Sequence, residues 1–172
     1  HAPHFWHGLN LSLKEKFEGN RDLLQQAKDL CEAVGGKSII VHLGTRGTLE
    51  ESMRQLNLLK NSKMIVENKP QISVDETQCV GTSPEDLAEV IRCCGVDICL
   101  DFAHAIAFSA FHRKNSLEVI RAFLRLNPAH YHLCDGLKED VKDEHFNLGE
   151  GNFDLKSILS LLPPLAYPFS FL

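Results

Sequence analysis

Short β-rich runs alternate with longer stretches of helical period along the chain, and this alternation most constrains its fold. Such an order is typical of βαβ units, which build a parallel sheet covered by helices. The predicted strands are Ser38–Val41, Lys63–Val66, Val96–Leu100, His130–Leu133 and Pro168–Leu172. The predicted helices are Asn20–Val34, Leu49–Leu59, Ser83–Cys94, Ser116–Leu126 and Leu155–Leu162. We expect a single α/β domain over residues 1–172.

Histidines and carboxylates follow these strands in a regular way. The positions are His42, Glu67, Asp101 with His104, and His132, and the steps between strands are 25, 34 and 31 residues. Each step is about one βα unit of a (β/α)8 barrel, which runs to about 250 residues. Because the carboxyl ends of all barrel strands lie on one face, where active sites form, we expect these side chains to converge.

The residue types at these positions indicate a metal site. Imidazole and carboxylate ligands together suit zinc, manganese or iron. Asp143 and His145 stand two apart, so an extended segment projects both from the same side. Neutralising two or three close dications requires several carboxylates, and the chain offers Glu67, Asp101 and Asp143.

The chain resembles the endonuclease IV and xylose isomerase-like TIM-barrel superfamily, which includes AP endonuclease family 2 and sugar phosphate isomerases or epimerases. The resemblance is strongest in Asp101–His104, His132–Asp135 and Asp143–Gly151. It implies that the chain covers strands two to eight of the barrel. The first strand would then precede His1, and a last ligand and the final helix would follow Leu172, so we expect an incomplete barrel.

The resemblance also implies a ligand set. Endonuclease IV proteins hold three zinc ions with nine residues, the ninth being a Glu at the end of the eighth strand. Here Tyr167–Leu172 resembles that strand, and the chain stops just before the position of the Glu. The other eight roles fall on His1, His42, Glu67, Asp101, His104, His132, Asp143 and His145.

Further site residues are expected around these ligands. Glu67 is the predicted catalytic bridge between metals, and Asp135 is predicted to act behind the ligands or on the substrate. Lys69 and Arg46 lie just past strand ends and are candidate contacts for an anionic substrate, although either could be a solvated surface charge. His4 stands where endonuclease IV proteins usually carry Tyr, and it either contacts substrate or packs.

Two reactions remain open at this point, beside a non-catalytic metal-binding barrel. The resemblance implies hydrolysis of the phosphodiester at abasic sites in DNA, with two to three zinc ions. His1 and His42 favour this reading, because they supply a metal position that single-metal relatives lack. The alternative is isomerisation or epimerisation of a sugar or sugar phosphate with Mn2+ or another divalent ion. The short loop after His42 favours the alternative.

Composition and net charge exclude few classes of function. The net charge of −5 argues against a broad basic nucleic-acid surface but permits a local one, since bound dications offset acidic ligands. The six cysteines form no C-x-x-C pair, so we expect reduced, mostly buried thiols in a cytoplasmic protein. No run of about 18 apolar residues is present, so we expect no membrane segment.

Overall fold

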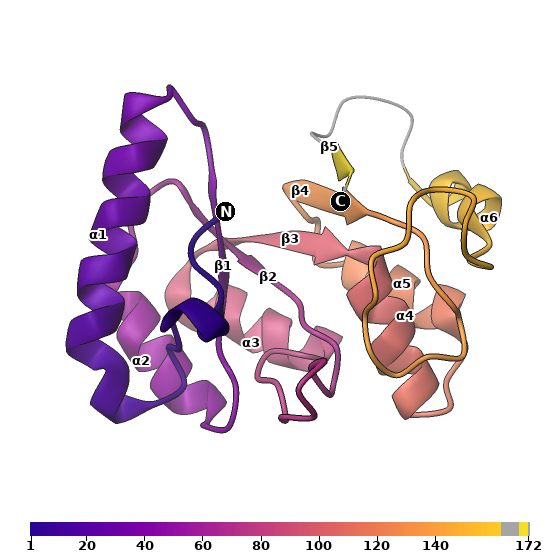
Figure 1. Ribbon diagram of the computed structural model, residues 1–172, viewed down its shortest axis with the longest axis horizontal. Coiled ribbons are helices and arrows are strands. Elements are labelled where there is room, and N and C mark those ends of the chain that lie inside the picture. Colours follow the sequence, from indigo (N-terminus) through magenta and orange to yellow (C-terminus); the bar gives the residue numbers. More distant parts are fainter. Residues whose placement is uncertain (163–168, 172) are drawn as a thin grey trace.

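Five parallel strands form one sheet at the centre of the molecule (Figure 1). The computed structural model describes residues 1–162 and 169–171. The strands are β1 (Ile39–His42), β2 (Met64–Glu67), β3 (Asp97–Asp101), β4 (His130–Leu133) and β5 (Phe169–Phe171), and they lie in this order across the sheet. Every neighbouring pair is parallel, which confirms the predicted βαβ architecture. Pro168 and Leu172, which end the last predicted strand, lie outside the described residues.

Helices connect the strands. They are α1 (Phe17–Ala33), α2 (Leu49–Leu59), α3 (Pro84–Cys94), α4 (Phe102–Phe111), α5 (Ser116–Leu124) and α6 (Leu155–Ser160), with 3-10 turns η1 (Phe5–His7) and η2 (Lys14–Lys16). Of the six helices within the described residues, five were predicted, and the Ser83 side chain forms a capping box with Asp86 at the start of α3. Helix α4 was not predicted from the sequence. Eight of its ten residues are buried, so it has no polar face and no amphipathic period.

The two faces of the sheet differ in what they bury. Residues that alternate along the strands, such as Val41, Val66 and Leu100, pack with the helices in the main core. Ile40, Ile65 and Cys99 form a second, small apolar cluster on the opposite face. The strand-end residues that continue this second face are His42, Glu67, Asp101 and His132. The pleat therefore directs the predicted ligands to the side of the sheet away from the main core.

Two other sequence expectations concern cysteines and membranes. All six cysteines are free, and five of them are buried, with Cys93 exposed. Within residues 1–162 and 169–171, no helix combines the length and apolarity that crossing a bilayer requires.

Candidate metal centre

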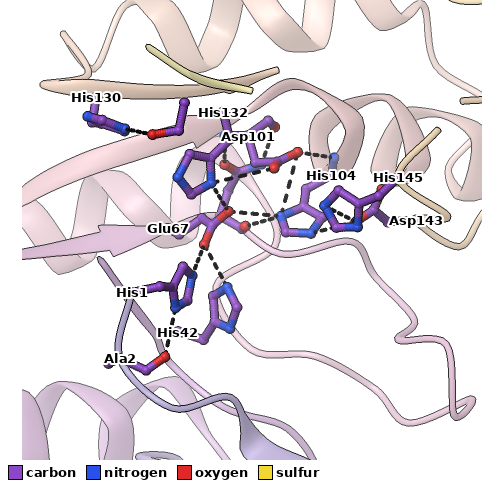
Figure 2. A network of polar contacts seen from close by, with 12 residues as sticks. His1, Ala2, His42, Glu67, Asp101, His104, His130, His132, Asp143 and His145 are labelled. Carbon is purple, nitrogen blue, oxygen red and sulfur yellow. Dashed lines mark hydrogen bonds and ion pairs between the residues drawn. The ribbon is translucent and has the colours of Figure 1, made fainter. Parts of the chain in front are cut away.

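Glu67 lies at the middle of the site, at the end of β2, and it is buried with 1% of its surface exposed. Its Oε2 atom lies 2.6 Å from His42 Nε2 and 3.0 Å from His1 Nε2. Its Oε1 atom lies 2.8 Å from His132 Nδ1 (Figure 2). The carboxylate thus has imidazoles on both of its oxygens, and these come from different segments of the chain.

A second group of ligands lies beside Glu67. Asp143 Oδ2 is 3.1 Å from His104 Nε2 and 3.0 Å from His145 Nε2. His104 connects the two groups, because its Nδ1 atom lies 3.6 Å from Glu67 Oε1 and 3.8 Å from Asp101 Oδ1. All eight predicted ligands therefore meet in one network, which Figure 2 shows.

The start of α4 positions two of these ligands. Asp101 is the N-cap of the helix, and its Oδ1 accepts a hydrogen bond of 2.8 Å from the backbone N–H of His104. This bond holds the first turn so that His104 reaches back over the strand end.

Asn68 is a positioning residue that the sequence analysis missed. Its side chain donates to the Asp101 carbonyl (3.0 Å) and accepts from the Asp101 N–H (2.8 Å). Its own carbonyl accepts from His104 Nδ1 at 2.8 Å. The available signal was a polar residue directly after Glu67 at a strand end, where an unpaired amide is costly to bury.

His1 is held in place through the backbone. The Ala2 N–H donates to the Ile40 carbonyl at 2.9 Å, which fixes the first residues along the edge of β1. His1 Nδ1 donates to the Ala2 carbonyl at 2.8 Å, as His104 Nδ1 does to Asn68. Ligating histidines commonly donate one ring N–H to a carbonyl, which leaves the other nitrogen for the metal. In both residues that other nitrogen is Nε2, which faces a carboxylate oxygen of Glu67 in His1 and of Asp143 in His104.

The charges of the site are strongly perturbed. Burial opposes ionisation of Glu67, but His42, His1 and His132 hold the pKa of its carboxyl well below the usual range. Burial, and then Lys69, hold the pKa of His42 well below its ordinary value. Burial also raises the pKa of Asp101. Burial lowers the pKa of His104, but Asp101 and Asp143 outweigh this effect and raise it.

Unpartnered buried atoms in the network fit a bound cation. Asp101 Oδ2, Asp143 Oδ1 and His42 Nδ1 are buried and have no hydrogen-bond partner among the described residues. Buried polar atoms are normally paired, so unpaired carboxylate oxygens beside imidazoles indicate ligands whose partner is a metal ion. The donor set of nitrogen and oxygen suits zinc or manganese.

The network opens into a cavity of about 460 Å3. Its lining residues are His1, His4, His42, Glu67, Lys69, His104, His132 and His145. Lys69 is buried, with 7% of its surface exposed, so the alternative of a solvated surface charge is wrong for this residue. Burial and the nearby Lys69 lower the pKa of His4 to about 4, so a neutral imidazole faces the cavity near neutral pH.

Two predicted site residues lie outside both the ligand network and the lining of this cavity. The Arg46 side chain is exposed, and its guanidinium lies 3.6 Å from Asp75 Oδ2. Asp135 is buried, but its carboxylate accepts backbone N–H groups of Gly136 (2.9 Å), Gly149 (2.9 Å) and Phe153 (3.2 Å). Asp135 therefore holds the loop that follows the Asp143–His145 ligands, which corrects its predicted role on the substrate or behind a ligating imidazole.

The two glycines of that loop are required for different structural reasons. Gly149 has a φ of +90°, a left-handed conformation that glycine adopts without strain. Gly151 is instead constrained by close approach, because an added Cβ would overlap the Gly136 carbonyl and the Asp135 carboxylate. A positive φ is therefore found at Gly149 and not at Gly151.

A parallel α/β sheet with imidazoles and carboxylates gathered at its carboxyl edge defines the class of barrel proteins that bind their ligands at strand ends. The chain belongs to the family of xylose isomerase-like TIM barrels, whose model matches residues 1–169. This confirms the predicted superfamily and fold class. The numbering of the strands as two to eight stays a prediction.

Three relatives illustrate the similarity. The probable endonuclease 4 of Shouchella clausii (strain KSM-K16) is 26% identical over 178 residues, which cover 92% of this chain and 60% of that protein. Endonuclease IV from Thermus thermophilus superposes with a TM-score of 0.71 at 22% identity, over 95% of this chain and 65% of that one. The probable 3-DHS dehydratase from Bacillus anthracis has a TM-score of 0.66 at 14% identity, over 95% and 66%. The chain thus spans less than two thirds of the length of each.

Proposed function

We propose that the protein is a multi-metal phosphodiesterase of the endonuclease IV kind, which cleaves the DNA backbone at abasic sites. The observation that carries this proposal is the environment of Glu67. His1 and His42 contact its Oε2 atom, while His132 contacts Oε1. A carboxylate with ligands on both oxygens is placed to bridge two cations, which a site for one ion does not require.

The ligand atoms fall into groups that support two to three zinc ions. One group is His1, His42 and Glu67, and another is Asp101, His104 and His145, with the ligand atoms of each within 4.8 Å of one another. Glu67 and His132 belong to a third group. Bound zinc would supply Lewis acidity and a nucleophile derived from water at neutral pH.

The side chains around the cavity suit an anionic substrate. Lys69 makes no ion pair with another described residue, and it lies among the cavity residues with its charge buried. Such an ammonium is available to pair with a phosphate oxygen and to orient it. Glu67 is ionised and holds three imidazoles in place, and the neutral His4 offers a polar contact at the cavity wall.

An aromatic pair lies near the cavity and favours a nucleic acid. Phe5 and Trp6 have ring centroids 4.9 Å apart, and 58% of the surface of Trp6 is exposed. The Trp6 ring is 4.7 Å from His4, which lines the cavity. Exposed aromatic rings stack on bases, so this pair offers a surface for nucleotides beside the cut phosphate.

A sugar or sugar phosphate isomerase is the second candidate, and the cavity favours it. A volume of about 460 Å3 is in the range of small-molecule sites, which run from about 300 to 1,000 Å3. Glu67, Asp101 and His132 would then hold one divalent ion, and Lys69 would bind the substrate phosphate. This reading gives no role to the contacts of His1 and His42 with Glu67.

Metal counting and a nicking assay test the proposal. The folded protein should bind two to three zinc equivalents by elemental analysis, whereas the sugar enzyme should bind about one ion. The zinc-loaded protein should nick a duplex with a single abasic site and leave an undamaged duplex of the same sequence intact. Metal loading without cleavage of the abasic duplex would refute the DNA activity and leave the isomerase and the non-catalytic barrel.

A further inference from the structure

Cys134 continues the ligand-bearing face of the sheet beyond the end of β4. Leu133 packs in the main core, so the alternation of the extended chain places Cys134 on the same side as His132. The residue is buried, with 1% of its surface exposed, and its thiol is free. No hydrogen bond joins its Sγ atom to another described residue.

Two ligands of the centre lie against this thiol. Cys134 Sγ, a carboxylate oxygen of Asp143 and a ring nitrogen of His145 all lie within 4.8 Å of one another. The chain holds this arrangement through a two-bond bridge, because the Asp135 and Phe146 backbones donate to each other's carbonyls at 2.9 Å. The bridge ties the segment after β4 to the segment that carries Asp143 and His145.

An unpartnered atom marks the same place. The Asp143 side chain is 6% exposed, and its Oδ2 contacts His104 and His145. Its Oδ1 is buried and has no partner among the described residues. A carboxylate oxygen without a donor, next to a thiol and an imidazole, is the donor arrangement of a cation site.

We propose that Cys134 is a metal ligand and that, with Asp143 and His145, it makes one position of the centre selective for a thiophilic dication such as zinc. The inference rests on the metal centre of the proposed function and adds sulfur to its nitrogen and oxygen ligands. The thiol proton leaves to solvent when sulfur binds the cation. Thiolate ligands select zinc over manganese or magnesium, so this residue determines which metal the position takes.

Cys99 provides the matched control. It also lies near two ligands, Glu67 and His132, and it is fully buried. It packs, however, in the apolar cluster with Ile40 and Ile65. Its two neighbouring ligands, Glu67 and His132, already contact each other at 2.8 Å, whereas Asp143 Oδ1 beside Cys134 has no partner among the described residues. The structure therefore assigns the sulfur ligand to Cys134 and leaves Cys99 as a packing residue.

Cobalt titration tests this assignment, because a cobalt–thiolate bond gives a charge-transfer absorption band that nitrogen and oxygen ligands do not. Wild-type protein and the Cys99→Ser variant should show the band as Co2+ is added, and Cys134→Ser should lose it. Zinc affinity at this position should fall by more than about tenfold in Cys134→Ser, with a smaller change for manganese. A band that persists in Cys134→Ser, or disappears in Cys99→Ser alone, overturns the assignment.

Equilibrium dialysis of the same samples separates this inference from the proposed function. Cobalt that binds to wild-type protein without a charge-transfer band refutes the sulfur ligand and leaves the metal centre standing, whereas no bound cobalt or zinc refutes both. Circular dichroism checks that Cys134→Ser folds. If it does not fold, X-ray absorption of the zinc-loaded wild-type protein decides the question, since a sulfur ligand gives a shell at about 2.3 Å and its absence overturns the proposal.

Discussion

His132 Nδ1 lies 2.8 Å from Glu67 Oε1, although 65 residues separate the two in the sequence. Their strands are not neighbours, because β3 lies between β2 and β4. The contact is therefore made over the face of the sheet opposite the main core, where both side chains extend from strand ends. The centre depends on at least three strands being assembled in register, so metal binding should report on the folded sheet.

Replacing Glu67 by Gln removes the negative charge that contacts imidazoles through both carboxylate oxygens, and it keeps the side-chain volume. We expect the protein to lose at least one bound zinc and the abasic-site cleavage to fall by about 100-fold or more, as when an electrostatic group of an active site is removed. Elemental analysis and the nicking assay measure the two effects. The exposed Glu50 gives the control, and Glu50→Gln should retain metal and activity. Full metal loading of Glu67→Gln would contradict the bridging role.

Lys69→Met tests the buried ammonium, because methionine keeps most of the side-chain volume without the charge. A charge-assisted hydrogen bond contributes about 1.5–3 kcal/mol, so affinity for a phosphate-bearing substrate should fall by about 10- to 100-fold. The measurement is KM for the abasic duplex and inhibition by inorganic phosphate. Arg46→Met is the control, since Arg46 is exposed and does not line the cavity. Equal effects of both substitutions would show a general electrostatic contribution instead.

Metal affinity should rise with pH. Asp101 and Asp143 raise the pKa of His104 above its ordinary value despite burial, so the ring is protonated below that pKa in the metal-free protein. A cation needs the neutral ring and must displace the proton, which adds up to a factor of about 10 in affinity per pH unit for each proton displaced. Above the pKa the contribution of His104 becomes flat. Calorimetry in two buffers of different ionisation enthalpy measures the protons released, and no release near neutral pH would contradict this prediction.

Metal removal should lower stability. Ions that bind only the folded chain stabilise it by about 2.7 kcal/mol at a free concentration 100 times the Kd. Without them, the paired charges and unpartnered oxygens of Asp101 and Asp143 remain buried. We expect chelation to lower Tm and zinc to restore it, as measured by scanning calorimetry. A Tm that does not respond to zinc would show that the folded state does not bind it.

Gly151→Ala should damage the loop that follows the Asp143–His145 ligands. The added methyl group meets the Gly136 backbone and the Asp135 carboxylate, which cannot move without breaking the bonds that Asp135 accepts. We expect a loss of about 1–3 kcal/mol in the free energy of unfolding and weaker zinc binding. In Gly19→Ala, by contrast, the new methyl group has nothing within 4 Å in an exposed helical turn, and we expect a gain of about 0.5–1 kcal/mol. Denaturant titration of both variants measures these changes.

The sequence was most informative where one physical rule determines position. The common direction of the strands placed His42, Glu67 and His132 together, and helical period located five of the helices. The same rules fail for α4, because a helix that is buried all round shows no period. No local pattern could show that Lys69 is buried, since its neighbours in space come from distant segments.

The roles of Asp135 and Asn68 were hidden for a related reason. Both make most of their hydrogen bonds to backbone groups. Every residue except proline has the same backbone donor and acceptor, so the sequence does not show which residue will be the partner. Asp135 resembles a catalytic acid in sequence, but in space its oxygens are occupied by amides of the following loop. Spacing therefore predicts which side chains come together. Which of them bind the metal and which position the ligands is visible only in the three-dimensional structure.

Asp101 both caps α4 and faces the metal centre, and these two roles limit which substitutions this position can tolerate. A mutation to a residue without a side-chain acceptor removes, together with the carboxylate, the hydrogen bond that begins this largely buried helix. Descendants that no longer needed a metal would still be under selection to retain a capping side chain at this position for folding alone. An aspartate at this position would therefore be weak evidence that catalysis is retained, and retention of exposed ligands such as His145 and His1 would be stronger evidence.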